Sequence, residues 1–64
     1  MSLGSKFIKY RKDLKMSQEG VAEVLNVTRQ TISNWELDLT SPDLEQTKKI
    51  CKLYKIDFYA ILYK

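Results

Sequence analysis

The sequence predicts an all-α domain of five short helices. Three features of the 64 residues support this prediction: apolar residues recur at helical spacing, residues that favour helix N-caps precede four of the expected helices, and no segment alternates in the manner of a strand. With 44% hydrophobic residues, one Pro and two Gly, the chain fits a single compact domain over residues 1–64. Residues 1–3 resemble a cloning remnant, and we give them little weight.

The first expected helix covers about residues 4–14. On a helical wheel, Leu3, Tyr10 and Leu14 fall within about 60° of Phe7, and the lysines of the segment fall on the other side. Arg11 is an exception, because it is a charged residue inside the apolar stripe. A charge buried there without a partner would cost several kcal/mol, so we expect a carboxylate from another helix beside it.

Two short helices joined by a tight turn are expected next, over about 18–25 and 28–36. Ser17 and Thr28 suit the two N-cap positions, and Asn26 suits a left-handed position in the turn. The apolar side of the helix over 18–25 is formed by Val21, Val24 and Leu25.

The helix over 28–36 has a divided surface. Its hydrogen-bonding side carries Arg29, Gln30, Ser33 and Asn34, and its other side carries Thr28, Thr31, Ile32 and Trp35. A helix fits the major groove of DNA, where Arg pairs bidentately with guanine and Gln or Asn pairs with adenine. The hydrogen-bonding side is therefore predicted to read base edges, although a merely solvated helix face would carry the same residue types.

A fourth helix is expected over about 43–54, with Ser41 or Asp43 as its N-cap and Pro42 in its first turn. The residues expected to face inward are Leu44, Thr47, Ile50, Cys51 and Tyr54. Asp57 then caps a fifth helix over about 58–63. The apolar residues of this helix suit core packing, and they equally suit a dimer interface that involves Leu37, Leu39, Tyr59 or Tyr63.

Composition argues against several classes of function. The chain has one Cys and no His, so it lacks the residues for an internal disulfide or a metal cluster. Cys51 is predicted to be a small core residue, with a reactive thiol as the lesser alternative. We find neither a glycine-rich phosphate loop nor a paired-carboxylate pocket, and we expect no enzymatic activity, cofactor or small-molecule substrate. No apolar run approaches the ~20 residues that span a bilayer, so we expect a cytoplasmic protein.

The net charge of +3 is unevenly distributed. Lysines and Arg11 make residues 1–15 and 48–64 basic, whereas the middle is net acidic apart from Arg29. Such a distribution suits a polyanionic partner if folding gathers the lysines on one side, and ordinary solvated helix faces would produce it as well.

The segment SQEGVAEVLNVTRQTISNWE, residues 17–36, resembles the helix-turn-helix of phage repressors and Cro proteins, the XRE family. The similarity extends from Phe7 to Leu62 and includes Pro42-Asp43-Leu44 at the start of the next helix. The resemblance implies a lambda-repressor-like fold of five helices. It also implies a sequence-specific regulator of transcription, most simply a repressor, that binds double-stranded DNA as a homodimer.

The resemblance assigns roles to particular positions. Base edges would be read by Arg29, Gln30 and Asn34, with Ser33 close by, and DNA phosphates would be contacted by Gln18, Thr28 and Thr31. Arg11 and Glu36 match a partly buried ion pair, which agrees with the carboxylate expected beside Arg11.

The loop after the reading helix departs from the family pattern, since Leu37-Asp38-Leu39 stands where a polar residue, a Gly and a Lys are usual. The loss of that cation and the apolar fifth helix favour an alternative, a protein-interaction module of the same fold such as an antitoxin-like subunit or adaptor. The polar face at Arg29, Gln30 and Asn34 favours DNA.

Overall fold

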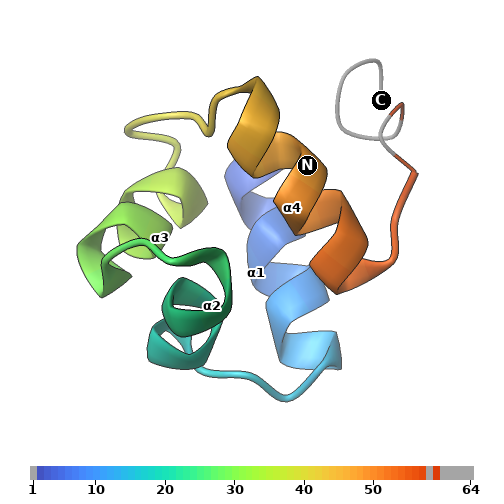
Figure 1. Cartoon of the computed structure of the whole chain (residues 1–64). Helices are drawn as coiled ribbons and strands as arrows, with labels where there is room; N and C mark the ends of the chain where they lie inside the picture. The colour runs from blue at the N-terminus through green and yellow to red at the C-terminus, as the bar shows by residue number, and fades with distance from the viewer. Residues whose placement is uncertain (1, 58, 60–64) are drawn as a thin grey trace.

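The computed structural model describes residues 2–57 and 59, and four helices lie within them (Figure 1). They are α1 (Leu3–Asp13), α2 (Gln18–Leu25), α3 (Arg29–Glu36) and α4 (Leu44–Tyr54). Helix α3 packs against both α1 and α2, and α2 also contacts α4. The fifth helix predicted over 58–63 lies, apart from Tyr59, outside the described residues. In the described part, no helix combines the length and apolar character that a bilayer crossing requires.

Each of the four helices begins at a side-chain cap. The acceptors are Ser2 Oγ for α1, Ser17 Oγ for α2, Thr28 Oγ1 for α3 and the Asp43 carboxylate for α4. The predicted caps at positions 17 and 28 are confirmed. Helix α4 begins after Asp43 rather than Ser41, so the placement of Pro42 in its first turn was wrong, and Pro42 instead precedes the cap. Ser2 contributes to the fold although residues 1–3 were given little weight.

The turn between α2 and α3 depends on Asn26. This residue has φ 59° and ψ 46°, the left-handed conformation predicted for it, and its N–H donates to the carbonyls of Ala22 and Glu23 at the end of α2. The N–H of Val27 also donates to Ala22 O, at 2.9 Å. Asn tolerates the left-handed region better than most residues, so the chain can reverse between the two helices within a few residues.

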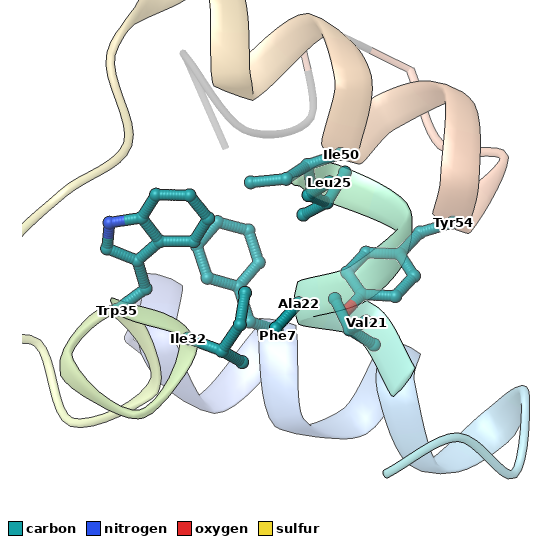
Figure 2. Packing of buried hydrophobic residues seen from close by; sticks show 8 residues of the cluster. All are labelled: Phe7, Val21, Ala22, Leu25, Ile32, Trp35, Ile50 and Tyr54. Carbon is teal, nitrogen blue, oxygen red and sulfur yellow. The ribbon is translucent and has the colours of Figure 1, made fainter. Parts of the chain in front are cut away.

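The core is assembled from all four helices (Figure 2). It contains Phe7 from α1, Val21, Ala22 and Leu25 from α2, Ile32 and Trp35 from α3, and Ile50 and Tyr54 from α4. Helices α1 and α4 also meet through Tyr10 and Tyr54, whose ring centroids are 5.7 Å apart. Burial, with a smaller contribution from nearby Glu36, raises the pKa of Tyr54 to about 12.

Three residues predicted to face inward are exposed instead: Leu14, Val24 and Leu44. Leu14 is the C-cap that follows the last residue of α1, and at this end of the helix its side chain is 42% exposed. Val24 lies beside the buried arc of α2, which is centred between Val21 and Ala22. Leu44 lies in the first turn of α4, before the first buried residue of that helix.

Candidate nucleic-acid interface

Helix α3 is held by its inner side and displays its outer side. Ile32, Trp35 and Glu36 are buried, whereas Arg29 and Gln30 are exposed and Ser33 and Asn34 are partly exposed. The four residues predicted to read bases thus share the outward face of one helix. Packing on α1 and α2 fixes that face relative to the rest of the domain.

Two of these side chains are joined to each other. Gln30 Nε2 donates to Asn34 Oδ1 at 3.0 Å, a contact between residues four apart on the same side of α3. This contact leaves the acceptor Gln30 Oε1 and the donor Asn34 Nδ2 available to further partners. One acceptor beside one donor is the pattern that complements the major-groove edge of adenine.

The residues assigned to phosphate contacts lie at helix N-termini. Gln18 is the first residue of α2, and Thr28 caps α3, accepting a hydrogen bond from Thr31 N at 3.1 Å. The hydroxyls of Thr28 and Thr31 are 2.9 Å apart. Helix N-termini present backbone N–H groups and positive partial charge, which suit an anion.

The structure brings Arg11 and Glu36 together in an ion pair. Arg11 Nε lies 2.7 Å from Glu36 Oε2 and Nη2 lies 3.1 Å from Oε1, while Nη1 donates to Met16 O at 3.0 Å. The side chains of Arg11 and Glu36 are 13% and 2% exposed. Hydrogen bonding to Glu36 raises the pKa of Arg11 and outweighs the opposing effect of burial. The pair explains how a charged residue sits within the apolar stripe of α1 and ties α1 to the end of α3.

A link between this ion pair and the outer face of α3 was not predicted from the sequence. Gln18 Nε2 donates to Glu36 Oε1 at 2.9 Å, and Arg29 Nη1 donates to Gln18 Oε1 at 3.2 Å. Four polar side chains therefore form a continuous chain from the interior to the surface: Arg11, Glu36, Gln18 and Arg29. Sequence spacing carries no signal for this chain, because its members come from three helices.

The loop after α3 also contains an unpredicted contact. Asp38 has φ 62°, and its Oδ1 accepts a hydrogen bond from Gly4 N at 2.9 Å, at the start of α1. A Cβ on Gly4 would collide with the carbonyl oxygen of Glu36, so the close approach of α1 to the end of α3 requires glycine. The acidic residue in this loop thus caps α1, and its carboxylate is used within the domain.

A helix-turn-helix family model matches residues 7–61 of the chain. The chain belongs to the helix-turn-helix family. It is 33% identical over 64 residues to the HTH-type transcriptional regulator ImmR of Bacillus subtilis (strain 168), and this alignment covers the whole chain and 50% of that relative. The chain therefore spans half the length of ImmR.

Two solved structures share the fold. The P22 c2 repressor protein, in complex with synthetic operator 9T in the presence of Tl+, has a TM-score of 0.92 and 25% identity, covering 98% of this chain and 96% of that chain. The N-terminal DNA-binding domain of SinR from Bacillus subtilis has a TM-score of 0.84 and 22% identity, and the match covers 97% of this chain and 91% of that chain. The predicted all-α, repressor-like fold and the family resemblance are confirmed.

Proposed function

We propose that this domain is a sequence-specific, double-stranded DNA-binding regulator of transcription, most simply a repressor that occupies its operator. The observation that carries the proposal is the outward face of α3, where Arg29, Gln30, Ser33 and Asn34 lie together on a helix fixed by its buried side. Family membership and the similarity to a repressor solved with operator DNA support it. Such a domain acts by binding rather than catalysis, and we place it in the cytoplasm.

In the proposed mechanism, the N-termini of α2 and α3 face phosphates and set the register of the protein on the duplex. Helix α3 enters the major groove, where Arg29 suits guanine and the linked Gln30 and Asn34 suit adenine. Phosphate contacts supply affinity for any sequence, and base contacts supply the preference among sequences.

Selection of binding sites from random duplexes tests this proposal. The wild type should enrich a defined sequence, and Arg29→Ala or Gln30→Ala should each lose about 1 to 3 kcal/mol of discrimination at one or two base pairs. Both side chains are exposed, so the melting temperature should stay within a few degrees of wild type. Full specificity in both variants would count against the proposal.

A protein-interaction module is the second candidate, and a specific observation favours it. Leu37 and Leu39 in the loop after α3 are 62% and 68% exposed, and Leu44 at the start of α4 is more than half exposed. Salt separates the two candidates, because DNA affinity falls log-linearly with ionic strength, whereas an apolar protein interface responds little.

We also propose that the domain binds DNA as a homodimer. The exposed Leu37 and Leu39 follow α3 directly, so a contact between two copies there would pair two reading helices about one duplex turn apart on a palindromic site. Tyr63, another predicted interface residue, lies outside the described residues, and Tyr59 is exposed. Sedimentation with the selected duplex should show two protein chains per duplex, and one chain on a full-length palindrome would contradict the dimer.

A further inference from the structure

A groove lies on the surface between α2 and α4, two helices that pack against each other. Its volume is about 300 Å³, and it is lined by Val24 and Leu25 from α2 and by Lys49, Lys52 and Leu53 from α4. Leu25 belongs to the buried core and Leu53 packs against that core, whereas Val24 is 58% exposed. The floor of this α2–α4 groove is therefore aliphatic, and part of its apolar surface remains in contact with water.

The charged residues that line the α2–α4 groove are both cations. Lys49 and Lys52 are exposed, and among residues 2–57 and 59 neither forms an ion pair, even with Glu45 one turn before Lys49. Lys52 lies in the last turn of α4, where a cation suits the helix dipole, but Lys49 lies earlier, outside the range of that effect. The groove thus offers aliphatic surface and positive charge side by side.

This combination favours an acidic protein segment over DNA or a second copy of the chain. Phosphates gain nothing from an aliphatic floor, and Val24 lies six residues after Gln18, about 9 Å along α2 from the N-terminus that we propose faces phosphates. A second copy carries the same net charge of +3, which opposes its approach to a basic groove. Carboxylates beside large aliphatic side chains complement both features of the groove.

We propose that the α2–α4 groove is a docking site for a short acidic, amphipathic segment of a partner protein. One or two large aliphatic side chains of the segment occupy the groove, and its Asp or Glu residues face Lys49 and Lys52, as when an amphipathic helix binds in a groove. A volume of about 300 Å³ accommodates few side chains, so the contact suits a transient partner. This surface is separate from the exposed leucines after α3, and its use does not depend on DNA binding.

Selection of random peptides displayed on phage, with the wild-type domain as target, tests the proposal. The enriched peptides should carry large aliphatic residues next to Asp or Glu. Their affinities, measured by fluorescence anisotropy, should fall by at least about tenfold for Val24→Glu, which places a carboxylate at the edge of the groove. Leu39→Glu is the matched control, an exposed leucine outside the groove, and should leave the affinities unchanged. Both positions are exposed, so both variants should fold, and their melting temperatures provide the check.

Reversal of the groove's charge supplies a second test. The double variant Lys49→Glu with Lys52→Glu should lose the acidic peptides and should bind analogues in which Lys replaces their Asp and Glu residues. Both side chains are exposed, so the double variant should keep the fold. This switch in preference would show that the two lysines face the carboxylates of the bound segment.

Four results would overturn the proposal. Two concern the peptides: enrichment of none, or enriched peptides that bind Val24→Glu as tightly as wild type. The third is self-association of the wild type that Val24→Glu abolishes in sedimentation, which would place a second copy in the groove. The fourth is weaker binding of random-sequence duplex by the charge-reversed variant with a shallower salt dependence, which would assign the lysines to the DNA backbone. Failure of the wild type to select a duplex sequence would overturn the proposed function and leave this proposal standing.

Discussion

Glu36→Ala should destabilise the domain severely. The substitution removes the acceptor of three hydrogen bonds, two from Arg11 and one from Gln18, at a side chain that is 2% exposed. Removing one partner of a buried ion pair costs about 3 to 5 kcal/mol, because the other charge is left uncompensated. Arg11 keeps its bond to Met16 O and is 13% exposed, so part of its charge can regain water. We therefore expect a loss of about 2 to 4 kcal/mol.

Thermal unfolding followed by circular dichroism measures this effect. For a domain of this size, 1 kcal/mol corresponds to about 4 to 8 °C, so the melting temperature should fall by about 10 to 25 °C. Glu23→Ala, at an exposed glutamate of α2, is the matched control and should change stability by less than about 0.5 kcal/mol. The double variant Arg11→Met with Glu36→Leu removes both charges and should recover at least half of the loss.

Two results would refute this reasoning. One is a melting temperature for Glu36→Ala within about 3 °C of wild type, since a stranded arginine costs more than that. The other is a double variant no more stable than the single one, because the loss would then come from packing and not from the stranded charge.

Three further predictions concern the fold. Gly4→Ala should lower the free energy of unfolding in urea by about 1 to 3 kcal/mol although Ala favours helix, because the new Cβ would collide with the carbonyl oxygen of Glu36. The matched variant Gly20→Ala meets milder contacts and should lose less. Equal losses in the two variants would contradict the close approach of α1 to the end of α3. Asp38→Ala should lower thermal stability by about 1 to 2 kcal/mol, because α1 loses its carboxylate cap, and Asp38→Asn, which keeps an acceptor, should lose less. The pKa of Tyr54 is raised to about 12, so the contribution of its buried hydroxyl to stability is complete below the unfolded pKa of about 10 and is lost as pH rises through 12. Wild type should therefore lose more stability between about pH 10 and 12 than Tyr54→Phe does. Equal losses in the two proteins would argue against a buried hydroxyl at this position.

The helix-turn-helix unit was predictable from the sequence because local chemistry determines it. Ser17 and Thr28 cap their helices through the backbone N–H three residues later, and Asn26 supports the left-handed turn between them. The outward position of Arg29 and Gln30 follows from helical periodicity once Ile32 and the other apolar residues of α3 are buried.

Contacts between distant parts of the chain were not predictable in the same way. Asp38 and Gly4 are 34 positions apart, and the departure of this loop from the family pattern gave no indication that its acid caps α1. The hydrogen-bonded chain from Arg11 through Glu36 and Gln18 to Arg29 depends on how three helices are placed, which periodicity does not specify. The exposure of Val24 shows the related limit that a helical wheel gives directions but not the width of the buried arc.

Chemical-shift mapping of the 15N-labelled domain with its selected duplex tests most directly whether the outward face of α3 reads base edges. The largest changes should occur at the side-chain signals of Arg29, Gln30 and Asn34, with backbone changes at the N-termini of α2 and α3. Exposed residues of α4, such as Lys52, should change little. Changes centred on α1 or α4, with those three side-chain signals unmoved, would contradict the claim.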